Sequence, residues 1–292
     1  IPSEIECWER EQKMNTIKII RDLLRDEAAE GQKMNVLARF IVAQVKFLRT
    51  DCFTFQWIRG ITLNAVHHRA SSTGCFYYKY YDPAEMKLVE RYLHNGDVFA
   101  DVGSNIGSWG LFAASCGAKT YAVEPAPSTF ALLKNNISLN PGLKDLIEPV
   151  QSAVGTGGGS VLFTVDNDSE NRVVTVEDCE GLITQSVEFK TLDEICHGAL
   201  DVAKIDVENY EIPVLKGAKG ILSSGNLNII VIEVFDNYRQ IDDLLRSYGY
   251  VQYIYDYKNN VLKKHHDRGC GNNAIYIKNL KKVIERIGCE VV

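Results

Sequence analysis

The stretch V-F-A-D-V-G-S-N-I-G-S-W-G, from Val98 to Gly110, decides how this chain is expected to fold. Three apolar residues followed by Asp101 predict a short buried strand, and Gly103 and Gly107 then bracket a turn that opens into a helix near Ser108. Glycine suits both positions because a residue without Cβ can take positive φ and lie close to a ligand. The N–H groups that begin the helix add a partly positive end. The stretch therefore predicts a turn that holds a nucleotide.

Two acidic residues indicate which kind of nucleotide this turn binds. A dinucleotide-binding turn reads G-x-G-x-x-G and has no carboxylate beside the pyrophosphate, whereas here the pattern is D-x-G-x-x-x-G, beginning at Asp101. A carboxylate repels a pyrophosphate and attracts a sulfonium or ammonium group, so the site favours S-adenosylmethionine over NAD. Glu124 ends the next apolar strand and is expected to hold a ribose diol. The alternative is that Asp101 only caps the helix and that Glu124 is a solvated loop acid.

The composition is that of a globular protein. Of the 292 residues, 46% are hydrophobic and 24% charged, which suits one large domain with an appendage. The net charge of -6 and a pI of about 5.6 disfavour nucleic acid as a partner, and no apolar run approaches the roughly 18 residues of a membrane span. Eight cysteines without a C-x-x-C pair indicate free thiols in a reducing compartment, so we expect a cytoplasmic protein. The first residue is Ile1, which leaves a removed targeting segment open.

Residues 1–74 predict an extension ahead of the main domain, which we assign to residues 75–292. Apolar residues at helical spacing predict a helical hairpin, and alternating residues predict a β-hairpin after it. The helices are expected at 5–25 and 33–48, and the strands at 53–57 and 61–66. We expect the helical hairpin to cover the ligand pocket, to pair subunits in a homodimer, or simply to pack on the main domain.

After a helix over 84–93, strands and helices alternate as in a doubly wound parallel sheet of the α/β class. The seven expected strands span 98–101, 120–123, 147–151, 202–207, 227–232, 251–257 and 273–277. No helix separates the last two, so one of them is expected to run antiparallel. An insertion at about 155–190 is expected to form a small β-hairpin.

A second group of charged residues follows the fourth strand of this sheet. Lys204, Asp206 and Glu208 alternate, which places them on one side if the strand extends that far, and Glu233 ends the fifth strand. Asp206, Glu208 and Glu233 could together hold a divalent cation, although we expect no metal. The alternative is that Lys204, Asp206 and Glu208 only form salt bridges at the end of the strand and have no catalytic role. We expect the residues around His265, His266 and Cys270 to form a polar surface loop rather than a metal cluster.

With these motifs in hand, the chain resembles class I S-adenosylmethionine-dependent methyltransferases, and more narrowly the FkbM family, from about Tyr81 to Ile277. The motifs that carry the resemblance are D-V-G-S-N-I-G at 101–107, A-V-E-P at 122–125, S-A-V-G at 152–155, T-L-D-E-I at 191–195, K-I-D-V-E at 204–208 and E-I-P-V-L-K-G-A at 211–218. The family usually has Gly after the glutamate of the K-I-D-V-E motif, and Asn209 takes that place here.

The resemblance implies a Rossmann-like fold and methyl transfer, most often to a hydroxyl of a sugar or another small molecule, by in-line displacement. Asp206 is the first choice for a general base, Glu208 is the second, and Lys204 would orient Asp206. The residues expected to bind S-adenosylmethionine are Tyr81, Glu85, Asp101, Gly103, Ser104, Asn105, Gly107, Glu124, Pro125, Ser152, Ala153 and Asp206. Two alternatives remain: a non-catalytic protein that keeps the cofactor pocket and recognises a partner, and a nucleic-acid ribose 2'-O-methyltransferase.

Overall fold

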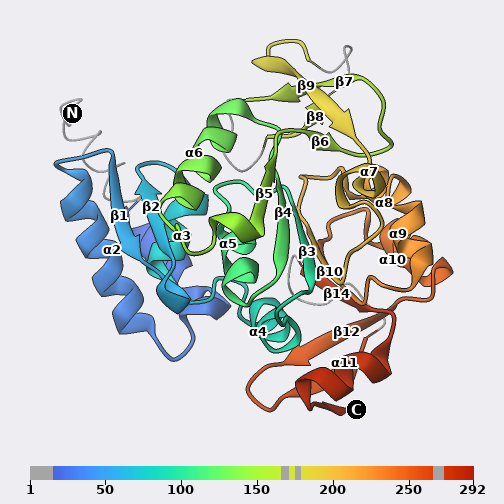
Figure 1. Ribbon diagram of the computed structural model, residues 1–292. Coiled ribbons are helices and arrows are strands. Elements are labelled where there is room, and N and C mark those ends of the chain that lie inside the picture. Colours follow the sequence, from blue (N-terminus) through green and yellow to red (C-terminus); the bar gives the residue numbers. More distant parts are fainter. Residues whose placement is uncertain (1–15, 166–170, 175–178, 266–272) are drawn as a thin grey trace.

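The computed structural model describes residues 16–165, 171–174, 179–265 and 273–292 (Figure 1). In that part of the chain a nine-stranded sheet has the order β15-β13-β12-β14-β11-β10-β3-β4-β5. The strands are β3 (Val98–Val102), β4 (Lys119–Val123), β5 (Ile147–Val150), β10 (Val202–Ile205), β11 (Ile229–Glu233), β12 (Val251–Asp256), β13 (Val261–Lys264), β14 (Asn273–Ile277) and β15 (Glu290–Val291). The seven predicted strands are present, and the short β13 and β15 extend one edge.

The direction of the strands agrees with the α/β prediction. Neighbours from β5 to β11 are parallel, and β14 is antiparallel to both β11 and β12. Within this sheet β3 comes first in the sequence, and β4 and β5 follow on one side of it. The chain then crosses over and adds β10 and β11 on the other side of β3. Sheets of this type bind ligands beyond the carboxyl ends of the strands where the order reverses, which here lies between β3 and β10.

Helices cover both faces of the sheet. One face packs against α4 (Pro83–Tyr92), α5 (Ser108–Ser115), α6 (Pro127–Ser138) and α11 (Leu280–Ile287). The other packs against α7 (Leu192–Cys196), α8 (Glu211–Lys216), α9 (Lys219–Ser224) and α10 (Tyr238–Ser247). In β11, Ile229 and Val231 join the first core while Ile230 and Ile232 join the second. Each of these fully buried side chains contributes about 1.5–3 kcal/mol through the hydrophobic effect.

The sequence predicts one helix over residues 212–222, but the structure has two helices there. The break between α8 and α9 falls at Gly217 and Ala218. A Cβ built on Gly217 would lie 1.7 Å from the carbonyl oxygen of Gly155. Only glycine therefore lets the backbone at residue 217 lie this close to the start of the insertion. The prediction of one continuous helix is therefore wrong. The apolar spacing predicted the helical segments but not the tertiary contact at Gly217, where the helix is interrupted.

The N-terminal extension contains the expected helices and β-hairpin, together with one helix that the sequence did not indicate. Residues 16–25 are helical, α2 spans Lys33–Phe47, and β1 (Cys52–Gln56) pairs antiparallel with β2 (Thr62–Val66). The earlier part of the first predicted helix lies outside the described residues. The additional helix, α3 (Ala70–Tyr77), crosses residue 74, so the division between extension and main domain stays a prediction.

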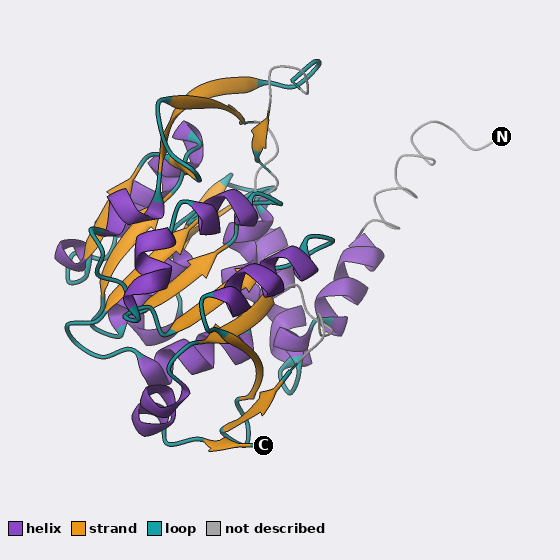
Figure 2. Cartoon of the chain, turned by 90° about the vertical axis from the view of Figure 1, so that its right-hand side faces the viewer, coloured by secondary structure: helices purple, strands orange, loops and turns teal. Residues whose placement is uncertain are grey.

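The insertion forms a separate small sheet with the order β6-β9-β7-β8, which Figures 1 and 2 place at the end of the molecule away from the C-terminus. Its strands are β6 (Ala153–Val154), β7 (Ser160–Thr164), β8 (Val173–Val174) and β9 (Thr184–Lys190). The predicted hairpin corresponds to the antiparallel pair β7 and β9. Ser152 Oγ donates to the carbonyl of Glu188 at 3.0 Å and so ties β9 to the end of β5.

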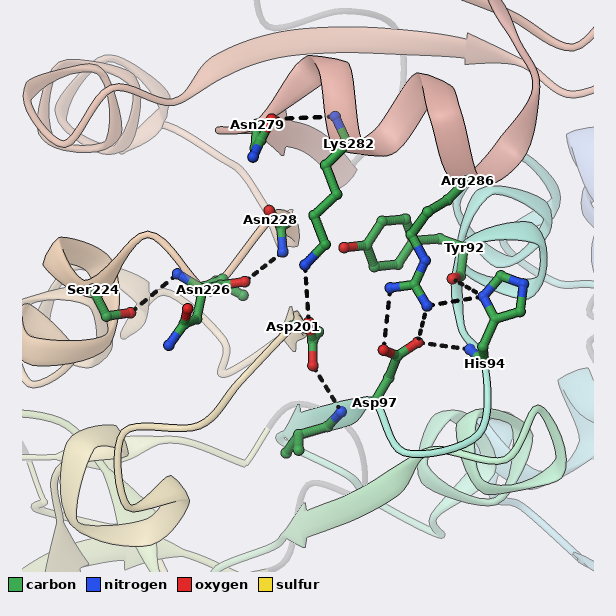
Figure 3. Close-up of polar contacts among 12 residues, drawn as sticks. Tyr92, His94, Asp97, Asp201, Ser224, Asn226, Asn228, Asn279, Lys282 and Arg286 are labelled. Atoms are coloured by element: carbon green, nitrogen blue, oxygen red, sulfur yellow. Dashed lines mark hydrogen bonds and ion pairs between the residues drawn. The ribbon is translucent and has the colours of Figure 1, made fainter.

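A polar network fastens α11 to the sheet (Figure 3). Arg286 donates to both carboxylate oxygens of Asp97, at 3.1 and 2.8 Å, and its guanidinium lies 4.5 Å from the ring centre of Tyr92. Lys282 Nζ lies 3.5 Å from Asp201 Oδ1, while Asp201 Oδ2 accepts from the backbone N–H of Val98 at 3.1 Å. Val98 is the first residue of β3, and Asp201 directly precedes β10. This network therefore holds the amino ends of β3 and β10.

Candidate active site

A cavity of about 400 Å³ opens beyond the carboxyl ends of β3, β4 and β10. Its volume lies within the range of roughly 300–1,000 Å³ that small-molecule sites have. The described polar residues that line it are Asp26, Ser71, Tyr78, Tyr81, Asp101, Ser104, Asn105, Ser108, Trp109, Glu124, Ser152, Asn171, Lys204, Asp206, Glu208 and Tyr210. Gly103, Pro125 and Ala153 line it as well, whereas Glu85, Gly107 and Glu233 are outside the lining.

Gly103 brings the turn after β3 against the end of β10. Its φ is +83°, and a Cβ built on it would lie 1.8 Å from the carbonyl oxygen of Asp206. The backbone N–H groups of Gly103 and Ser104 both donate to the carbonyl of Val123, at 3.0 and 2.9 Å. Only glycine combines this positive φ with such a close approach. The turn therefore joins the ends of three neighbouring strands at the floor of the cavity.

Asp101 is buried at the cavity wall and caps the helix that follows. Its Oδ2 accepts from the backbone N–H of Gly110, the third residue of α5, at 2.8 Å. Burial raises the pKa of Asp101 from 3.8 to about 7, although the hydrogen bond from Gly110 opposes the shift. Asp101 thus makes the capping contact of the alternative interpretation and also lines the cavity.

Glu124 is held by backbone N–H groups on both sides. Its Oε2 accepts from Asn105 at 3.0 Å and its Oε1 from Ala126 at 2.9 Å. Burial raises the pKa of Glu124 from 4.5 to about 7 against the effect of these two hydrogen bonds. Glu124 is therefore a buried, oriented carboxyl and not a solvated loop acid. Beside it, Asn105 Oδ1 is buried with no hydrogen-bond partner among the described residues.

Lys204 and Asp206 form an ion pair at the cavity. Lys204 Nζ lies 3.2 Å from Asp206 Oδ2 and donates to Asn273 Oδ1 at 2.8 Å. The Lys204 side chain is 2% exposed, while that of Asp206 is 39% exposed. Because β10 ends at Ile205, strand alternation does not bring Asp206 and Glu208 together as the sequence suggested. The turn after the strand does so.

The two charges of this pair stabilise each other. Burial lowers the pKa of Lys204, but attraction to Asp206 and Asp82 outweighs it, so the pKa lies above that of an ordinary lysine. Burial likewise raises the pKa of Asp206, and Lys204 outweighs this, so the pKa lies below that of an ordinary aspartate. At neutral pH the site therefore presents an ionised carboxylate held by a buried ammonium.

Glu233 completes a cluster of carboxyl groups with Asp206 and Glu208. One oxygen from each lies within 4.8 Å of the others. Burial, together with the nearby charge of Asp206, raises the pKa of Glu233 to about 9, so this carboxyl is neutral at pH 7 and shares a hydrogen bond with Asp206. Oxygen donors of this kind suit magnesium or calcium. The Lys204 ammonium already pairs with Asp206, however, and a neutral Glu233 is a poor ligand.

The turn after Asp206 explains the departure from the family pattern. Glu208 has φ +54° and Asn209 has φ +69°, both in the left-handed region. Asparagine tolerates this region better than most residues other than glycine. Asn209 can therefore take the position where the family usually has Gly without changing the path of the turn, and Glu208 lines the cavity.

Comparison with known proteins identifies the family of this chain. The model of the methyltransferase FkbM domain matches residues 101–251, which is just over half of the chain. The chain belongs to the FkbM methyltransferase family. Membership implies S-adenosylmethionine as the methyl donor.

This FkbM methyltransferase is similar to hexuronic acid methyltransferase AglP of Haloferax volcanii. The two are 31% identical over 155 residues, which are 51% of this chain and 60% of that protein. Among solved structures, methyltransferase FkbM from Methylobacillus flagellatus is 17% identical with a TM-score of 0.44, covering 62% of this chain and 43% of that one. TYW2 from P. horikoshii in complex with MeSAdo is 15% identical with a TM-score of 0.43, covering 83% and 81%.

Some residues of the FkbM methyltransferase cavity were missed in the sequence. Ala70, Ser71 and Gly74 belong to α3, which lies outside the segment that the family model matches. Ser71 Oγ is buried with no hydrogen-bond partner among the described residues. The segment A-S-S-T-G-C-F-Y gives little helical signal, because serine, threonine and glycine are poor helix formers. The extension therefore supplies one wall of the cavity through α3, a helix outside the predicted helical hairpin.

The insertion supplies a further part of the FkbM methyltransferase cavity, through Phe163, Asn171 and Val173. The predicted residues Glu85 and Tyr81 differ in their placement. Tyr81 lines the cavity and its hydroxyl lies 2.8 Å from Ser108 Oγ, whereas Glu85 is outside the lining. Burial and the charge of Asp82 raise the pKa of Glu85 to about 7.

The cavity suits the cofactor that the family implies. Carboxyl groups predominate among the ionisable acids and bases of its described lining, where Lys204 is the one lysine or arginine and is paired with Asp206. Such a lining attracts a sulfonium and an ammonium group. Asn105 Oδ1 and Ser71 Oγ remain to be satisfied by a polar ligand. Among the described residues, none of the helices has the length and apolar character that crossing a membrane requires.

Proposed function

We propose that this FkbM methyltransferase transfers a methyl group to a hydroxyl of a sugar or another small molecule. The observation that carries this proposal is the ionised Asp206, held by Lys204 and partly exposed at the cavity. S-adenosylmethionine supplies an electrophilic methyl group on a positively charged sulfur. A hydroxyl must lose its proton as it attacks, and a carboxylate within hydrogen-bond reach can accept that proton.

The chain's residues divide this work between binding and proton transfer. Asp101 and Glu124 are proposed to bind the cofactor together with the turn at Gly103, Ser104 and Asn105. Asp206 is proposed to accept the hydroxyl proton while the oxygen–methyl bond forms and the methyl–sulfur bond breaks. Lys204 keeps Asp206 ionised and oriented. Holding the reacting atoms in line is expected to contribute most of the rate enhancement.

Two observations support a small acceptor. The cavity is lined in part by α3 and by the insertion, and its described lining contains the carboxyl groups of Asp26, Asp206 and Glu208, which would repel a nucleic-acid backbone. The relative from Haloferax volcanii carries the name hexuronic acid methyltransferase. Because this chain spans about 60% of that relative, the choice of a sugar as acceptor is part of the proposal.

The proposal is tested by separating cofactor binding from turnover. Asp206→Asn should lower kcat by roughly 10²–10⁴-fold while the Kd for S-adenosylmethionine changes only a few-fold. Methyl transfer from labelled S-adenosylmethionine to a panel of neutral sugars, uronic acids and other hydroxylated small molecules provides the assay. Glu208→Gln is the matched control and should cost much less. Full activity of Asp206→Asn, or a larger loss with Glu208→Gln, would reject Asp206 as the base.

The same assay addresses the divalent cation. With Lys204 paired to Asp206, activity is expected to be unchanged after dialysis against a chelator. A loss that magnesium or calcium restores would show that the cluster of Asp206, Glu208 and Glu233 binds metal. If every acceptor fails while S-adenosylmethionine binds, the non-catalytic alternative is favoured.

A further inference from the structure

The outward face of α2 carries a row of exposed apolar side chains. Met34 is 78% exposed, Ile41 54%, Val45 53% and Leu48 84%, and Ala38 between them is exposed too. The opposite face is buried against the protein through Val36, Phe40, Ala43 and Phe47. Figure 1 shows α2 at the outside of the molecule, with the rest of the chain on one side of it. This α2 is therefore apolar on both faces.

The spacing of the row indicates what covers it. Positions 34, 38, 41, 45 and 48 are separated by four, three, four and three residues, which is the a/d pattern of a helix that packs along another helix. This row is a seam with a period of 3.5 residues, and Val42, which is 45% exposed, flanks it on one side. A helix lying in a lipid interface instead presents a broad apolar face bordered by solvated cations. Two cations farther round α2 are engaged with their own chain, since Arg39 donates to the carbonyl of Tyr77 at 2.9 Å and Lys46 Nζ lies 4.2 Å from the ring centre of Phe53.

We propose that the seam, residues 34, 38, 41, 45 and 48, pairs with the same seam of a second copy of this chain, antiparallel about a two-fold axis at Ile41. Met34 then lies against Leu48 of the partner subunit, and Ala38 against Val45 of the partner subunit. Small and large residues face each other in this order, whereas a parallel pair would place Ala38 on Ala38 of the partner subunit and leave a gap. The antiparallel order also opposes the two helix dipoles.

The residues beside the seam agree with this pairing. In an antiparallel pair, Arg49 faces Asn35 of the partner subunit, Val42 faces Val42 of the partner subunit and Leu37 faces Gln44 of the partner subunit. No like charges meet across these positions. An isologous contact of this kind closes on itself, so it yields a dimer and not a filament.

The dimer would support the cavity wall from behind. The buried face of α2 packs on α3, where the rings of Phe40 and Tyr77 have centres 5.8 Å apart. The cavity-lining residues Ser71 and Gly74 belong to the same α3. Pairing two copies of α2 therefore fixes the helix on which α3 rests. This inference stands independently of the proposed methyl acceptor.

The first test is the mass of this 292-residue chain in solution. Sedimentation and light scattering should give twice the monomer mass of 32.8 kDa at micromolar concentration. Ile41→Glu places a charge at the centre of the seam and should give a monomer with the same circular dichroism spectrum. Lys33→Glu is the control on the same helix, outside the seam, and should remain a dimer. A wild-type monomer throughout this range would overturn the proposal.

Cross-linking tests the orientation. In a Cys52→Ser background, which removes the thiol that is exposed among the described residues, Ile41→Cys should form a disulfide-linked dimer on mild oxidation. Leu48→Cys alone should not, whereas a mixture of Met34→Cys and Leu48→Cys should. Efficient self-linking of Leu48→Cys would overturn the antiparallel order. Sedimentation with vesicles of anionic lipid provides a last test. If the wild type is a monomer that sediments with the vesicles and Ile41→Glu does not, the seam binds a membrane surface and the dimer is overturned.

Discussion

The pKa values of Asp101 and Glu124 predict that cofactor binding releases protons. Burial raises the pKa of each carboxyl to about 7 in the ligand-free protein, so each is about half protonated at pH 7. A bound sulfonium and ammonium favour the ionised forms. Binding therefore expels protons, and the affinity for S-adenosylmethionine should rise as the pH rises through 7.

The size of the effect follows from the fraction of each carboxyl that is ionised. A group with pKa near 7 is only about one-tenth ionised at pH 6 and about nine-tenths at pH 8, so the need to ionise costs about tenfold in affinity at pH 6, or roughly 1.4 kcal/mol. If both carboxyls must ionise, Kd should rise by up to about a hundredfold from pH 8 to pH 6. Asp101→Asn removes one of the two groups and should reduce this change to about tenfold.

Calorimetry provides the measurement. Titrations at pH 6, 7 and 8, each in two buffers with different heats of ionisation, give both the Kd and the number of protons released. S-adenosylhomocysteine is the matched control ligand, because its sulfur is uncharged, and its affinity should depend less on pH. Equal Kd values for S-adenosylmethionine at pH 6 and pH 8, with no proton release, would refute the electrostatic reasoning.

Three further predictions concern the turns and the terminal helix. Gly103→Ala should lower the free energy of unfolding, measured by chemical denaturation, by roughly 3 kcal/mol or more, because the added Cβ meets a backbone carbonyl. Gly158→Ala is the control: the residue has a similar positive φ but nothing within 4 Å, and the loss should be only about 1–2 kcal/mol. Equal losses would contradict the close contact. Asn209→Gly should keep activity and stability within about 1 kcal/mol, since φ is +69° there, while a β-branched residue should not. Arg286→Met should lower the free energy of unfolding by about 1–3 kcal/mol, because Asp97 loses the cation that it pairs with. Lys281→Met, at an exposed ion pair, should change it by less than about 0.5 kcal/mol. Similar values for the two would reject the network.

Periodicity and turn residues predicted the sheet well, because its central strands are buried on both faces and read as short apolar runs between glycine-rich turns. The turn at Asp101 and Gly103 could be found in the same way. What the sequence could not show is where contacts between distant segments decide the structure. The helix α3 forms from poor helix formers because it packs between α2 and the main domain, and Gly217 divides a predicted helix because it meets Gly155.

The charged cluster shows the same limit. Spacing identified Lys204, Asp206 and Glu208, but attributed their proximity to strand alternation beyond Ile205, where β10 has already ended. Glu233 was found from its position at the end of β11. Its raised pKa depends on burial and on the charge of Asp206, which spacing alone does not reveal. Asn273, which accepts from Lys204, carried no signal at all because its strand is distant in sequence.

Two walls of the cavity come from segments far apart in the sequence: α3 supplies one and the strands of the insertion supply the other. A ligand bound between the two walls contacts both of them and restrains segments that are far apart in the sequence. Its arrival should slow amide exchange in α3 and in β7 together, even though these elements belong to different layers of the molecule. The ligand would then be a structural component of the enzyme as well as its reagent.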